Sequence, residues 1–187
     1  MNRTIFLIML LSFNPTMTVA QECNESMVVD TPNERFLDQG NGTVIDNNTG
    51  LMWKKCSEGQ SYNAQTRNCD GVASLYVSNE ALAFAENINS TGFAGHTDWR
   101  VPNVKELSSI IESSCVNPAI NINVFKNTPS GPFRTSTPVG YNRFYCIHFA
   151  NGEVKTTCDP VQGGSGMGGG MGAPDVYEGY LRFVRGK

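Results

Sequence analysis

The chain has 187 residues, and its 14 Lys and Arg residues against 17 Asp and Glu residues give a formal net charge of −3 at pH 7. No block of basic residues occurs, which argues against a nucleic acid as the partner. The length fits one ordinary domain, and the sequence contains no apolar run long enough to span a membrane.

The first twenty residues predict a signal peptide. Arg3 gives a weakly positive start, residues 5–11 form an apolar run, and Thr18-Val19-Ala20 provides the small residues that signal peptidase recognises. The apolar run is too short to cross a bilayer, which takes about 20 apolar residues. An interfacial anchor or the first strand of the fold is the alternative. We expect cleavage after Ala20 and a protein that is secreted or stays in the periplasm.

We do not expect Cys23, the third residue after this cleavage point, to carry lipid. Glu22, which is not a small residue, precedes Cys23. The predicted mature chain divides into an N-terminal extension at residues 21–34 and one domain at residues 35–187.

All six cysteines lie beyond the cleavage point, and an even count in an exported chain predicts disulfides. Spacing alone does not decide among the pairings that six cysteines allow. It favours Cys56–Cys69 across a polar loop and Cys146–Cys158 across a hairpin, which would leave Cys23–Cys115. No C-x-x-C pair occurs and both histidines lie far from any cysteine pair, so we predict no metal site.

The N-terminal half of the domain reads as strands and turns. Residues 35–46 predict a β-hairpin around Asn41-Gly42, a pair that tolerates positive φ. Within it, Asp38 and Asp46 are expected to bond to turn amides or to a neighbouring cation, because the spacing does not fit a calcium loop. A buried strand ending at Trp53 and a cross-linked loop at residues 56–74 follow.

Two helices are predicted in the middle of the chain. The first spans residues 79–89, with Ser78 as its cap. The second spans residues 103–114 and begins with the capping-box pair Asn103 and Glu106. In the extended segment between them, we expect Trp99 to fill the core and Arg100 to pair with a carboxylate.

The C-terminal part predicts more strands. We expect strands at residues 133–137 and 180–185, and a hairpin whose strands, 145–149 and 153–157, flank Asn151-Gly152. Residues 163–172 contain only Gly, Met and Ser. They are either a flexible loop or a lip beside a ligand surface, with Met167 and Met171 as contacts. Strands, then two helices, then strands predict an α+β fold with antiparallel sheets.

Several ordered motifs resemble one bacterial family, the Lcl C-terminal domain family, over about residues 35 to 186. They are Arg35-Phe36, Asp38 to Trp53, Cys56 to Gln60, Asp98 to Pro102, Lys105 to Leu107, Asn117 to Asn121 and Val184 to Gly186. The resemblance implies a C-type-lectin-like fold. It also implies glycan binding, because the name-giving member is a collagen-like surface adhesin whose C-terminal domain binds sulfated glycosaminoglycans.

The sequence departs from the family pattern in three places. It has no collagen stalk, Arg134 stands where the family usually has Trp after Phe133, and residues 163–172 look like an insertion. The sugar-binding triplets of calcium-dependent lectins are also missing. We therefore do not expect calcium-bridged sugar recognition.

An anionic glycan would need cationic side chains to meet its sulfates and aromatic rings to stack on its sugars. The candidate ligand-binding residues are Arg134, Tyr141, Arg143, Tyr145, Lys155 and Arg182. The acidic net charge argues against strong heparin affinity, although a chain with an acidic net charge can still carry a local basic patch.

The leading hypothesis is a secreted lectin-like module that contacts glycans at a cell surface. The alternative is a protein-interaction or structural subunit of an envelope, pilus or adhesin assembly. We predict neither a cofactor nor an enzyme, because no G-x-S-x-G elbow is present and nothing places a base beside a nucleophile. Formylglycine-generating oxidases resemble the fold but need a reduced cysteine pair to bind copper.

Overall fold

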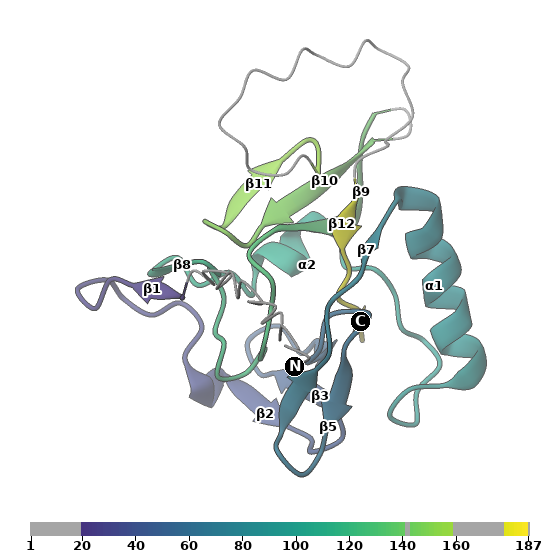
Figure 1. Cartoon of the computed structure of the whole chain (residues 1–187), viewed down its shortest axis with the longest axis horizontal. Helices are drawn as coiled ribbons and strands as arrows, with labels where there is room; N and C mark the ends of the chain where they lie inside the picture. The colour runs from purple at the N-terminus through teal and green to yellow at the C-terminus, as the bar shows by residue number, and fades with distance from the viewer. Residues whose placement is uncertain (1–19, 141–142, 159–177, 187) are drawn as a thin grey trace, which may run out of the picture.

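The computed structural model describes residues 20–140, 143–158 and 178–186. These residues form a mixed α+β structure whose elements occur in the order strands, helices, strands (Figure 1). The helices are η1 (Asn33–Arg35), α1 (Ser78–Thr91) and α2 (Val104–Ser108). The strands are β1 (Glu22–Cys23), β2 (Phe36–Asp38), β3 (Thr43–Asp46), β4 (Met52–Lys54), β5 (Ser61–Asn63), β6 (Asn68–Asp70), β7 (Leu75–Tyr76), β8 (Cys115–Val116), β9 (Pro132–Gly140), β10 (Arg143–His148), β11 (Glu153–Lys155), β12 (Gly179–Tyr180) and β13 (Val184–Arg185).

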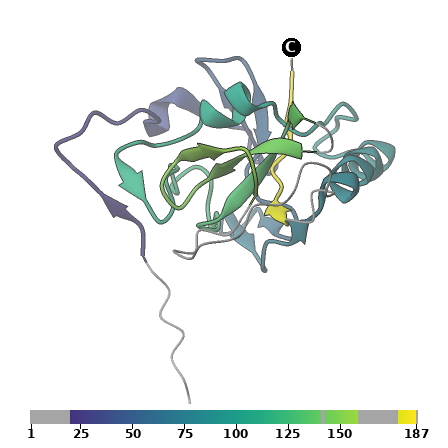
Figure 2. The same cartoon turned by 90° about the horizontal axis from the view of Figure 1, so that it is seen from above.

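Two larger sheets and two small ribbons organise these strands. The five-stranded sheet has the order β11-β10-β9-β12-β7, and the four-stranded sheet has the order β13-β4-β3-β2. The ribbons are β1-β8 and β5-β6. Pairing is antiparallel except between β9 and β12. Figures 1 and 2 place α1 and the N-terminal extension on opposite sides of the sheets.

The hairpin predicted around Asn41-Gly42 is confirmed. β2 and β3 pair with Phe36 opposite Asp46 and Asp38 opposite Val44. Asp38 Oδ1 accepts the Gly40 N–H at 2.9 Å. Turn geometry therefore fixes this register, as the sequence indicated.

The charged residues of this hairpin pair as expected. Arg35 donates to both oxygens of Asp46 at 2.7 and 2.6 Å, and Lys55 Nζ lies 2.7 Å from Asp38 Oδ2. Burial alone would raise the pKa of Asp46, but the hydrogen bonds from Arg35 and Thr49 outweigh it, so the pKa lies below its usual value.

Two hydrophobic clusters hold the elements together. The larger one lies around Trp53, Phe125, Phe133, Phe149 and Leu107, and so joins both sheets to α2. Trp99, Leu181 and Phe183 form the smaller one, which the α1 side chains Phe84, Ala85 and Ile88 cover. Trp53 and Trp99 therefore fill the core as predicted. Arg100 meets both oxygens of Glu106 at 2.7 and 2.8 Å, which confirms its predicted carboxylate partner.

Both helices exist, but their ends differ from the prediction. Val77, and not Ser78, occupies the cap position of α1, where its N–H donates to Glu80 Oε2 at 3.0 Å. α2 begins with the predicted capping box: Asn103 Oδ1 accepts from the Glu106 N–H at 2.9 Å. It ends at Ser108, six residues before the expected position, because the chain turns there to bury Ile110 and reach the N-terminal extension.

One loop prediction and one strand prediction were wrong in part. Residues 56–74 contain the short hairpin β5–β6 as well as loop. The expected strand at residues 180–185 is interrupted, because Leu181 to Phe183 cross from β12 in one sheet to β13 in the other. All three crossing side chains are buried, so this segment is packed on every side.

All three predicted disulfides are confirmed, and none of the six cysteines is free. They are Cys23–Cys115, Cys56–Cys69 and Cys146–Cys158. The Gly-rich residues 163–172, with Met167 and Met171, and the signal-peptide residues 1–19 lie outside the described residues.

Gly59 provides a test of packing in the Cys56–Cys69 region. Its φ is +90°, and a Cβ there would lie 2.6 Å from Ser74 N and 2.8 Å from Val72 O. Gly40 also has a positive φ, but nothing lies within 4 Å of its Cβ position. We expect Gly40→Ala to lower the free energy of unfolding by about 1 kcal/mol through backbone strain alone, and Gly59→Ala by roughly 2 kcal/mol, because backbone atoms cannot yield. Denaturant unfolding compares the two, and equal losses would contradict the packing argument.

Candidate functional site

The structure describes five of the six residues predicted to bind an anionic ligand and places two of them in the interior. Arg134 and Arg182 are only 2% and 1% exposed. Tyr141 lies outside the described residues. Arg143 is exposed on β10 beside the half-buried Tyr145. Among the described candidates, Arg134 and Arg182 are therefore buried, whereas Arg143 is exposed.

Arg182 belongs to the interior of the fold. Its guanidinium donates to the backbone oxygens of Lys54 and Lys55, to Ser57 Oγ at 3.2 Å and to Thr128 Oγ1 at 2.7 Å. These bonds join the loop after β4 to the loop before β9. A sulfate would have to break them to reach the cation, so the prediction of a ligand role for Arg182 is corrected to a structural one.

The electrostatics of Arg182 agree with an interior position. Its guanidinium carbon lies 4.8 Å from the centre of the Phe125 ring. Burial lowers the pKa of Arg182 to about 9, despite the attraction of Glu58. Nothing in the sequence indicated that Arg182 is buried. It stands between the apolar residues Leu181 and Phe183, and a strand with one solvent-exposed face would show the same alternation.

Arg134 is also interior. It lies on β9 opposite Cys146, and its Nε donates to the Tyr76 backbone oxygen at 2.6 Å. The Arg134 side chain therefore links β9 to β7 across β12. Arg134, which stands where the family usually has Trp, is therefore a buried cation and not the exposed ligand contact that we predicted.

The cations that remain at the surface lie along β10 and β11. Lys155 Nζ is 3.2 Å from Glu153 Oε2 on the same strand. Hydrogen bonds from Lys155 and Asn151 hold the pKa of Glu153 below its usual value. Arg143 is thus the exposed cation of the predicted set that forms no ion pair with any described residue. One such residue is a weak basis for binding a polysulfate.

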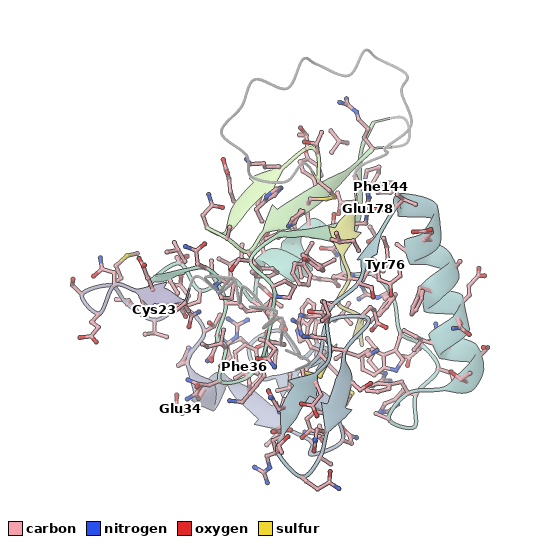
Figure 3. The ribbon with its side chains drawn as sticks, viewed as in Figure 1. Cys23, Glu34, Phe36, Tyr76, Phe144 and Glu178 are labelled. Atoms are coloured by element: carbon pink, nitrogen blue, oxygen red, sulfur yellow. A yellow bond between two sulfur atoms is a disulfide. The ribbon has the colours of Figure 1, made fainter. Side chains whose placement is uncertain are left out.

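A groove of about 400 Å³ lies elsewhere, between the N-terminal extension and the segment that follows α2. We call it the extension groove. Its lining residues are Gln21, Cys23, Asn24, Glu25, Met27, Val29, Thr31, Pro32, Asn33, Glu34, Glu112, Ser114, Cys115, Ile120, Asn121, Ile122 and Asn123. In Figure 3, Cys23 and Glu34 lie on one side of the molecule, and Tyr76 and Phe144 lie on the other. The groove is therefore remote from the Phe144 end of β10.

Covalent and hydrogen-bonded links hold the two walls of the groove together. β1 pairs with β8 so that Cys23 lies opposite Cys115, to which it is bonded. Gln21 Nε2 donates to the Pro118 and Ile120 backbone oxygens at 2.6 and 2.7 Å. Asn121 Nδ2 donates to the Thr31 backbone oxygen at 2.7 Å. The groove is therefore a preformed feature rather than a gap beside a loose tail.

Glu112 lies at the base of the extension groove and is 3% exposed. Its carboxylate accepts two hydrogen bonds from Thr31, at 2.8 and 2.7 Å, and two from Ser114, at 3.2 and 2.6 Å. The Asp30 N–H adds a fifth, at 3.2 Å. Burial would raise the pKa of Glu112, but these bonds outweigh it and lower the pKa to about 2. All five donors are neutral, so the carboxylate keeps its negative charge.

The groove combines apolar side chains with acidic ones. Met27, Val29 and Ile122 line it and are 46%, 54% and 37% exposed. Glu25 and Glu34 are exposed at the rim. No lysine, arginine or histidine occurs among the described residues of the lining. This surface is suited to a ligand that is apolar and positively charged, and not to a polyanion.

A family model described as the Lcl C-terminal domain matches residues 42–163. The chain belongs to the Lcl C-terminal domain family. None of the curated proteins matches it.

The Lcl C-terminal domain match contains one wall of the extension groove and leaves out the other. Residues 112–123 lie within the matched range, whereas residues 21–34 precede it. Sequence reasoning treated residues 21–34 only as an extension and missed the groove. The available signal was the apolar run Met27-Val28-Val29 among four acidic residues, tied down by Cys23.

Neither a membrane-spanning helix nor a cluster of potential metal ligands occurs among the described residues. None of their helices is long and apolar enough to cross a membrane. Within the same ranges, no three His, Cys, Asp or Glu side chains come together as potential metal ligands. All six cysteines are in disulfides.

Proposed function

We propose that this member of the Lcl C-terminal domain family is an extracytoplasmic binding module that recognises a partner at a cell surface without transforming it. The observation that carries the proposal is the extension groove, an open and apolar recess whose walls are joined by a disulfide. Concave and largely apolar recesses are where proteins usually bind ligands. Three disulfides fit an oxidising compartment, and the predicted signal peptide provides the export route.

A protein partner fits this groove better than a sulfated glycan does. Glu25, Glu34 and Glu112 would repel sulfates, whereas exposed Met27, Val29 and Ile122 offer apolar surface. This favours a subunit of an envelope or adhesin assembly. The C-type-lectin-like fold that the family resemblance implies is part of the proposal, since domains of that shape also bind proteins.

A second candidate, the binding of a sulfated glycosaminoglycan, is favoured by the exposed Arg143 next to Tyr145 on β10. The guanidinium can meet a sulfate and the ring can stack on a sugar. Lys155 would contribute only by exchanging its Glu153 partner for the glycan.

The test uses residues 21–187 with the disulfides formed. The protein is offered to an array of sulfated and desulfated glycosaminoglycan fragments over a salt titration, and in parallel it is cross-linked to proteins of the bacterial envelope. For the protein-binding form we expect a stoichiometric cross-linked partner and little glycan binding. Sulfation-dependent binding that falls with salt and is lost in Arg143→Ser would establish the glycan form instead. Failure to bind in both arms would overturn the proposed function.

A further inference from the structure

We infer that the extension groove docks a short cationic segment of a protein partner, in which a lysine or arginine lies beside an aliphatic or aromatic side chain. The inference rests on the proposed function and names the chemistry of the partner. It concerns residues 21–34 and 112–123, which line the groove and are joined by the Cys23–Cys115 disulfide.

The size and lining of the groove set the apolar part of this ligand. About 400 Å³ lies at the low end of what ligand pockets offer, which is room for a few side chains and not for a folded domain. Met27 and Val29 face it from the extension, and Ile122 faces it from the other wall. These side chains are partly exposed, so an apolar side chain entering the groove would remove their surface from water.

The charge of the groove sets the cationic part. Glu25 and Glu34 are exposed at the rim, and the ionised Glu112 at the base has no cation among its described hydrogen-bond donors. The neighbouring Arg35 does not neutralise them, because its guanidinium makes two hydrogen bonds to Asp46. A lysine or arginine of the partner would supply the missing positive charge at the edge of a low-dielectric recess, where charge pairing is stronger than in water.

Short peptides of defined composition test the inference on residues 21–187. The probe is a fluorescent hexapeptide of alternating lysine and leucine, with one control peptide of glutamate and leucine and another of lysine and serine. Fluorescence anisotropy should give at least tenfold tighter binding of the lysine–leucine peptide than of either control. Backbone amide shifts in NMR spectra should change within residues 21–34 and 112–123.

Matched variants separate the groove from the rest of the surface. Glu34→Lys and Ile122→Lys should weaken binding of the lysine–leucine peptide at least tenfold. The same substitutions at exposed positions outside the groove, Glu86→Lys and Val72→Lys, should change it less than twofold. Thermal unfolding checks that all four variants are folded.

Three results would overturn the inference. They are equal binding by Glu34→Lys and Glu86→Lys, amide shifts confined to other residues, and a concentration-dependent dimer that Ile122→Lys abolishes, which would make a second copy of the chain the occupant. If the envelope partner still binds Ile122→Lys while the peptide does not bind any form, the groove inference fails and the proposed function stands.

Discussion

Replacing Cys23 and Cys115 together by serine is expected to lower the free energy of unfolding by about 4–5 kcal/mol. This bridge joins residues 92 positions apart, whereas Cys56–Cys69 joins residues 13 positions apart. A cross-link that closes a longer loop removes more conformational freedom from the unfolded chain. The matched double replacement of Cys56 and Cys69 is therefore expected to cost only about 3 kcal/mol. Denaturant unfolding without reductant measures both, and neither variant leaves an unpaired thiol.

The two double variants should also differ in where they act. Losing Cys23–Cys115 frees one wall of the extension groove, so amide hydrogen exchange across residues 21–34 should become faster. Losing Cys56–Cys69 should leave that exchange unchanged. A loss of stability that is equal in the two variants, or larger for the short loop, would contradict the dependence on loop length.

The parts of the fold that the sequence predicted are those that local chemistry decides. Asn41-Gly42 and Asn151-Gly152 mark hairpins because few residues tolerate the turn geometry. Asn103 and Glu106 mark the start of α2 because their side chains satisfy free backbone N–H groups. Each of these features involves residues within about four positions of one another, so no knowledge of the tertiary structure was needed.

The parts that the sequence did not predict depend on segments far apart in the chain. α2 ends early because the following residues turn toward the N-terminal extension, about 80 residues earlier, as the bond between Glu112 and Thr31 shows. Arg182 looked like a surface cation, but its acceptors come from Lys54, Lys55, Ser57 and Thr128. Nothing next to Arg182 in the sequence indicates that these acceptors exist.

The candidate site shows the same division. Arginines and tyrosines were chosen for their chemistry, yet burial decides which of them a ligand can reach, and burial is a property of the packed sheets. The extension groove arises where two distant segments meet, so neither segment alone resembles a site. Glu112 has two roles in this groove. Its buried carboxylate attaches the extension and also gives the groove a negative charge.

Acid should loosen the N-terminal extension through Glu112. The folded state lowers the pKa of this group from 4.5 to about 2, so its contribution to stability is present above pH 4.5 and is lost as the pH falls toward 2. A shift of that size corresponds to about 3 kcal/mol. Asp38, Asp46 and Glu106 also have lowered pKa values and add to acid destabilisation, so the effect must be read as a difference between variants.

Glu112→Gln provides that difference. The amide has one acceptor oxygen in place of two and points an NH₂ group at N–H or O–H donors, so the variant should lose about 3 kcal/mol of stability near pH 7. Its stability should approach that of the wild type as the pH falls from 4.5 toward 2, because the Glu112 carboxyl of the unfolded wild-type chain takes up a proton there while the folded carboxylate stays ionised. Glu153→Gln, on the exposed β11, is the control and should show little change at either pH. Denaturant unfolding at a series of pH values, with hydrogen exchange at the Thr31 and Ser114 amides, measures both effects. A gap between Glu112→Gln and wild type that stays constant from pH 7 to pH 2 would show that the charge of Glu112 does not hold the extension in place.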